Sequence, residues 1–144
     1  MEETPDGADT VETVPGESPR DRHWDLFDPE HEVPERLAVA AEAALERNAR
    51  NGLVLDLRGL SDAADYFVIV TGDSDVHARA IADSVTERLE EIGEEPAGVE
   101  GRSSGRWILI DYIDVVVHVF LERVRDFYQL ERLWGDAPRA ELGG

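Results

Sequence analysis

Cysteine is absent from the 144 residues, which excludes disulfides, thiolate metal sites and cysteine nucleophiles. Lysine is absent as well, so all 14 basic residues are arginines. No apolar run approaches the roughly 18 residues that a membrane span needs. The N-terminus, from Met1 to Asp6, is acidic, whereas a secretory signal needs a basic start followed by an apolar stretch. These absences predict a cytosolic protein.

Acidic residues, by contrast, are abundant: 33 acids against 14 bases give a formal charge of −19. A surface this anionic repels phosphate backbones, which argues against RNA or DNA as the main ligand and favours a partner with a basic surface. A second explanation stays open, because a salt-loving host also selects acidic proteins that keep their solubility in brine.

The length and the 42% of hydrophobic residues predict one domain with a core. Residues 1–33 combine prolines, glycines and many acids without an apolar period, so they predict an acidic, disordered arm. Its only cluster of large apolar residues is Trp24, Leu26 and Phe27. Residues 34–137 form the predicted globular domain, and 138–144 a flexible tail.

Within that domain the apolar periodicity alternates between helices and strands. Helices are predicted over 34–48, with Asn51-Gly52 as the stop, over 74–93, with Ser74 as the N-cap, and over 124–134. The last helix should bury Val124, Phe127, Leu130 and Trp134. Strands are predicted over 53–57, 66–71 (nearly all apolar, hence central), near 99, and over 107–111 and 115–120. This order predicts the α/β class, with a mixed β-sheet flanked by helices.

The last two strands form a predicted hairpin in which successive side chains point to opposite faces. Trp107, Leu109 and Asp111 therefore share one face of the first strand, and Asp114, Val116 and His118 share one face of the second. If the strands align, that face is apolar at its centre and acidic at its rim, as protein interfaces tend to be. Trp107 and His118 have an alternative interpretation as ordinary core residues.

No catalytic or metal-binding pattern accompanies this surface. The four histidines lack the paired spacing of metal ligands, and neither a nucleophile elbow nor a phosphate loop occurs. Gly72-Asp73-Ser74 opens a helix and resembles an anion cradle, but the acids around it argue against phosphate, and an N-cap explains Ser74 more simply. We therefore expect no cofactor and no metal.

The combined segments resemble the ribosomal silencing factor (Iojap) family. The resemblance is carried by Leu60-Ser61 with Ala64 to Ile69, by Gly72 and Ser74, by 80–82 and 99–101, and by 107–111, 114–120 and 127–136. The resemblance covers the sequence from about residue 35 to residue 137. Many members have glycine where Ile113 stands, so the hairpin turn is expected to differ here.

The resemblance implies a non-catalytic protein whose topology is like that of nucleotidyltransferases without their catalytic motif, and which forms a homodimer when free. It also implies binding to large-subunit ribosomal protein fourteen, which blocks joining of the small subunit and represses translation under starvation. Carried over to this sequence, the partner-binding residues are Asp65, Trp107, Leu109, Asp111, Tyr112, Asp114, Val116 and His118.

Two other function classes remain as alternatives. A nucleotidyltransferase-like enzyme needs two carboxylates spaced by one residue to hold magnesium, whereas Asp83 is followed by Ser84 and Val85. A dimeric adaptor without ribosome contact is compatible with the same sequence.

Overall fold

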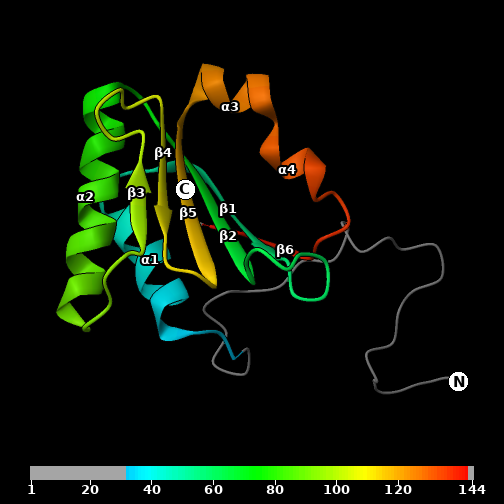
Figure 1. The fold of residues 1–144 in the computed structure, drawn as a ribbon. Helices are drawn as coiled ribbons and strands as arrows, with labels where there is room; N and C mark the ends of the chain where they lie inside the picture. The colour runs from blue at the N-terminus through cyan, green and yellow to red at the C-terminus, as the bar shows by residue number, and fades with distance from the viewer. Residues whose placement is uncertain (1–31, 143–144) are drawn as a thin grey trace, which may run out of the picture.

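The computed structural model describes residues 32–142 of the chain. It shows a six-stranded mixed sheet in the order β3-β4-β5-β2-β1-β6 (Figure 1). The elements are α1 (Glu35–Glu46), β1 (Arg50–Asp56), β2 (Tyr66–Gly72), α2 (Asp75–Glu91), β3 (Gly98–Glu100), β4 (Trp107–Asp111), β5 (Val115–Leu121), α3 (Glu122–Tyr128), α4 (Leu130–Leu133) and β6 (Arg139–Glu141). The predicted α/β class, with a mixed sheet flanked by helices, is confirmed.

Strand β2 lies in the middle of this sheet, as its apolar composition predicted. It pairs in parallel with β5 and antiparallel with β1, and six of its seven residues, all except Phe67, are buried. The other pairs, β1 with β6, β3 with β4 and β4 with β5, are antiparallel.

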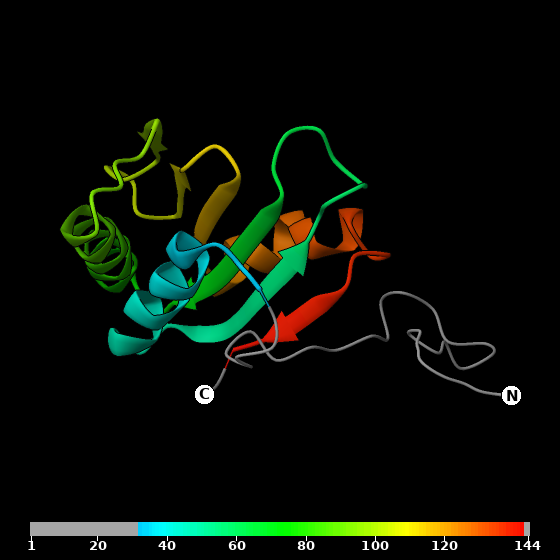
Figure 2. The ribbon, with the colours of Figure 1, turned by 90° about the horizontal axis from the view of Figure 1, so that it is seen from below.

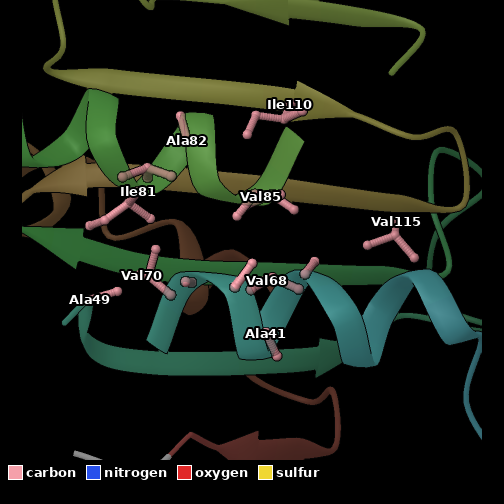
Figure 3. Packing of buried hydrophobic residues seen from close by; sticks show 14 of the residues in the cluster. Ala41, Ala49, Val68, Val70, Ile81, Ala82, Val85, Ile110 and Val115 are labelled. Carbon is pink, nitrogen blue, oxygen red and sulfur yellow. The ribbon is translucent and has the colours of Figure 1, made fainter. Parts of the chain in front are cut away.

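Helices α1 and α2 cover one face of the sheet side by side (Figures 1 and 2). Four alanines of α1 are fully buried there, and such small side chains let the helix lie close to its neighbours. The Ser84 hydroxyl of α2 donates to the Ala43 carbonyl of α1 at 3.0 Å, which links the two helices. Figure 3 shows α2 side chains, among them Ile81 and Val85, directed toward the strands. Burial of each such side chain contributes about 1.5–3 kcal/mol.

Capping sets the two ends of α2. The Ser74 hydroxyl accepts the His77 backbone N–H at 3.1 Å, and Gly93 follows the helix with φ at 82°. Both boundary predictions are confirmed. No helix among residues 32–142 is long and apolar enough to cross a membrane.

The stop predicted at Asn51-Gly52 is wrong. Helix α1 already ends at Glu46, and Asn48 takes the left-handed conformation with φ at 61°. Asn51, with φ at 53°, lies inside β1, where the register with β2 shifts between Arg50 and Leu53. The positive-φ residue therefore forms a β-bulge and does not end a helix.

The single helix predicted over 124–134 is wrong as well, because Gln129 breaks it. Gln129 has φ at 48°, and its N–H donates to the Arg125 carbonyl at 2.8 Å, which closes α3 before α4 begins. Leu130 and Trp134 then pack against the sheet face opposite α1 and α2 together with Val124. Phe127, predicted to be buried, is 80% exposed.

The end of the chain is better ordered than a flexible tail over 138–144 would be. Arg139–Glu141 form β6 at the edge of the sheet beside β1 (Figure 2). The side chains of Ala140 and Leu142 are buried. The prediction of a flexible tail is therefore wrong for residues 138–142. The arm predicted over 1–33, including its Trp24–Phe27 cluster, lies outside the described residues except for Glu32 and Val33.

Candidate docking surface

The sheet face opposite α1 and α2 carries the predicted hairpin surface. The register of β4 and β5 places Leu109 opposite His118 and Asp111 opposite Val116. Residues opposite each other in an antiparallel pair point to the same face. The prediction that Trp107, Leu109 and Asp111 share a face with Val116 and His118 is therefore confirmed.

Part of this face stays accessible. Trp107, Leu109, Asp111 and Val116 are all partly exposed, whereas their neighbours on the other face, Ile108 and Ile110 among them, are fully buried. Apolar side chains that remain accessible on a sheet face are a common basis for protein contacts. We define the candidate docking surface as Trp107, Leu109, Asp111 and Val116 together with Phe67.

Phe67 was not among the residues expected at this surface. It stands opposite Val116 in the parallel β2–β5 pair and is partly exposed. Its ring meets that of His118 edge-on, with centroids 4.6 Å apart. The strand alternation that separates Phe67 from buried Tyr66 and Val68 was visible in the sequence, but the apolar run around it indicated only a buried strand.

His118 supports this surface from beneath, because only 3% of the residue is exposed. The Trp107 indole N–H donates to His118 Nδ1 at 3.2 Å, so the neutral ring carries its proton on Nε2. Nε2 has no hydrogen-bond partner among residues 32–142. Burial lowers the pKa of His118 to about 4, so the ring is uncharged at neutral pH. The expectation that His118 contributes its side chain to a docking surface does not hold; it positions Trp107.

Trp107 is fixed from its other side by aromatic rings. It stacks on Phe120 with centroids 4.8 Å apart and meets Tyr128 of α3 at 4.9 Å. These contacts hold the indole in one orientation at the edge of the surface. Its removal would therefore lower folding stability as well as any binding that uses it.

Tyr112 belongs to the core and not to the docking surface. The residue is 4% exposed and packs in the cluster beneath α1 and α2, and burial raises its pKa to about 12. The physical reason is strand alternation, which places Tyr112 on the helix-covered face of Ile108 and Ile110 and not on the face of Asp111. The backbone turns at Tyr112, where its N–H donates to the Val115 carbonyl at 2.8 Å.

The two remaining predicted acids lie at the turn end of the hairpin. Asp114 forms an ion pair with Arg36 of α1 at 2.6 Å, so its charge is already matched. Asp65 is exposed, and its backbone N–H donates to the Asp114 carbonyl at 2.8 Å. The structure thus brings Asp65 and Asp114 together, but Asp65 alone offers an unengaged carboxylate at this end.

The turn itself is strained at the position where the family resemblance leads one to expect glycine. Ile113 has φ at 75° and is 66% exposed. The left-handed region is costly for a β-branched residue. The Asp111 carboxylate accepts the Ile113 N–H at 2.8 Å and helps to hold that conformation.

The residues considered for a nucleotidyltransferase-like enzyme have structural roles. Ser74 caps α2, and the Asp73 carboxylate accepts a hydrogen bond from Arg50. Asp83 accepts two hydrogen bonds from Arg102, at 3.0 and 2.7 Å. Among residues 32–142 no group of three or more His, Asp or Glu side chains is arranged to hold a metal ion.

Comparison with known proteins places this fold in a family. A sequence profile described as ribosomal silencing factor during starvation (RsfS) matches residues 30–144. The ribosomal silencing factor RsfS of Bacillus subtilis is 45% identical over 106 residues, which cover 74% of this chain and 90% of that protein.

Two solved structures are also similar. A crystal structure of a Chromobacterium violaceum protein has a TM-score of 0.71 and 38% identity, covering 79% of this chain and 95% of that one. A crystal structure of a Bacillus halodurans protein has a TM-score of 0.67 and 39% identity, covering 75% and 98%. With this profile match over most of its length and relatives of such identity, the chain belongs to the ribosomal silencing factor family.

Proposed function

We propose that this protein silences ribosomes by binding the large subunit through ribosomal protein fourteen, which prevents the small subunit from joining. Family membership supports the silencing role. The observation that carries the site is the partly exposed strip of Trp107, Leu109 and Val116, with Asp111 at its end, on a sheet face that the helices α1 and α2 leave open.

The chemistry of that strip suits a basic protein surface better than RNA. An apolar centre excludes water from the contact, and carboxylates at its edge attract cationic side chains and orient the partner. Asp111 and Asp65 supply these charges in a chain whose net charge is −19. The same net charge opposes a contact made mainly with phosphates.

The proposed mechanism is steric, with no covalent step. A protein of this size seated on the face where the small subunit docks occupies the space that the small subunit needs. In free solution, in the cytosol, the protein forms a homodimer. Sedimentation equilibrium of the purified chain tests that state, and a monomer at every accessible concentration would contradict it.

Co-sedimentation with purified ribosomal subunits at the host's own salt concentration tests the function. The protein should pellet with large subunits and not with small ones, and it should prevent their joining in a light-scattering assay. Isolated ribosomal protein fourteen should compete for it. Equal sedimentation with both subunits would contradict the proposal.

A matched pair of variants separates the site from bulk charge. Asp111→Asn removes one negative charge but keeps an oxygen that can accept the Ile113 N–H. Glu90→Gln makes the same charge change on an exposed position of α2, on the helix-covered side. We expect weaker large-subunit binding for Asp111→Asn alone, by about fivefold to tenfold if the carboxylate meets a cation at the contact. Equal effects of the two variants would place the contact elsewhere.

A further inference from the structure

A groove of about 580 Å³ lies at the Trp107 end of β4, beside the first helix of the C-terminal pair. Its apolar lining consists of Trp107, Val124, Phe127 and Tyr128. Phe127 and Tyr128 are 80% and 53% exposed, which is unusual for adjacent aromatic residues on a helix. The groove was not predictable from a continuous helix over 124–134, because that helix would have buried Phe127.

Two arginines give this groove a positively charged lining, although the protein as a whole is acidic. Arg106 and Arg123 line it, and neither side chain forms an ion pair or a side-chain hydrogen bond with another residue of 32–142. Seven other arginines in the same range do form ion pairs with carboxylates. The occupant that fits such a groove combines large apolar side chains with carboxylates.

The chain itself contains a segment with that chemistry. In His23-Trp24-Asp25-Leu26-Phe27-Asp28 two aromatic residues and a leucine alternate with acids. It is the only cluster of large apolar residues before position 30, where the family match begins. A tethered segment also binds at a high effective concentration, so a modest intrinsic affinity suffices.

The linker is long enough for this segment to reach the groove. The Arg36–Asp114 ion pair places the start of α1 beside the β4–β5 turn. Trp107 lies at the other end of β4, about 13 Å away along the strand, and the groove is on the sheet face opposite α1, which adds about 10 Å across the layer. Glu32 follows Trp24 by eight positions, and a fully extended chain of that length spans up to about 27 Å.

We propose that residues 23–28 dock in this groove of their own chain, with Trp24 and Phe27 against the exposed aromatic rings and the carboxylates of Asp25 and Asp28 toward Arg106 and Arg123. The arm then covers the Trp107 end of the candidate docking surface. A partner that uses Trp107 has to displace it. The docking itself does not depend on what that partner is.

Paramagnetic relaxation in the full-length chain tests the proposal. Because the protein contains no cysteine, Ser104→Cys gives a single nitroxide site at the groove. Glu90→Cys, an exposed position near the end of α2, gives a control site, because Asp75 at the start of that helix neighbours Gly105 and Glu90 lies about 22 Å further along the helix. The Trp24 indole N–H and the amides of 23–28 should lose intensity with the label at position 104 and keep it with the label at position 90. Equal or absent losses would overturn the proposal.

Charge reversal checks the cause of the docking without a label. Arg123→Glu should shift the Trp24 indole signal toward its position in the urea-unfolded chain and lower the docked-to-free ratio by about tenfold or more, because repulsion replaces attraction. Arg47→Glu makes the same charge change outside the groove and should leave that signal in place. A Trp24 signal that ignores Arg123→Glu would overturn the proposal. So would relaxation seen only between labelled and unlabelled copies in a mixed sample, which would identify a second molecule as the occupant.

Discussion

Replacing His118 by Gln should remove a pH dependence of stability that the native protein carries on the acid side of neutrality. The His118 ring is buried among Phe67, Trp107 and Phe120, and burial lowers its pKa from 6.5 to about 4. Gln is uncharged at every pH and can still offer an oxygen to the Trp107 indole N–H. The substitution therefore isolates the ionisation from the hydrogen bond.

The sign and size of the effect follow from proton linkage. Above pH 6.5 the ring is neutral in both the folded and the unfolded chain, and the stability is complete. As the pH falls from about 6.5 toward about 4, the unfolded chain binds a proton that the folded chain resists, so the free energy of unfolding decreases. A displacement of this size corresponds to a loss of about 3 kcal/mol by pH 4, at 1.36 kcal/mol per pKa unit.

Urea unfolding followed by circular dichroism, at a series of pH values from about 7.5 to 4, measures this loss. All other ionisable groups are the same in both proteins, so the difference between the two profiles reports His118 alone. The native chain should lose about 2–3 kcal/mol more than the variant over the range. Parallel profiles, or an NMR titration of the His118 ring centred near its ordinary pKa, would refute a neutral, buried histidine beneath Trp107.

Three further changes test the faces of the sheet, the turn and the last strand. Ile108→Ala should lower the free energy of unfolding in urea by about 2–5 kcal/mol. Leu109→Ala, on the open face, should lower it by less than half as much and should weaken large-subunit binding. The reverse order would show that the two faces are assigned the wrong way round. Ile113→Gly should raise the unfolding free energy by about 0.5–1 kcal/mol, because glycine accepts the positive φ, and an unchanged or lower midpoint would show that the turn is not strained. Ala140→Glu should lower the free energy of unfolding by about 2 kcal/mol or more, and the melting temperature by several degrees, since it buries a charge between β1 and the helix-covered core. An unchanged melting temperature would instead support the flexible tail that the sequence predicted.

Much of the candidate site could be predicted from strand alternation alone. Trp107, Leu109 and Asp111 had to share a face because the period of a strand is two, and Leu109 pairs with His118 as a short hairpin turn requires. The same local rules located the N-cap at Ser74, the central strand β2 and the order of helices and strands. These features depend on residues close together in the sequence.

Accessibility on that face was decided by tertiary packing. His118 and Val116 have the same alternation, yet His118 is buried between rings of three different elements and Val116 is partly exposed. Tyr112, by contrast, follows the alternation onto the face of Ile108 and Ile110, so its burial could have been inferred from the sequence. No pattern within the hairpin separates His118 from Val116, since their exposure depends on side chains that are distant in sequence.

The C-terminal region shows the same division most clearly. The apolar spacing of 124–134 indicated a helix, and most of these residues are helical. The left-handed Gln129 changes the chain direction between α3 and α4. As a result the Trp134 ring contacts Phe67 of β2, and Phe127 is exposed. The short segment 139–141 carries little strand signal of its own and becomes β6 only because β1 presents an unpaired edge. The sequence by itself determined which segments are helical or extended and which side chains alternate. The tertiary structure decided where each segment lies and which side chains stay exposed, because burial and edge pairing require partners that the local sequence does not contain.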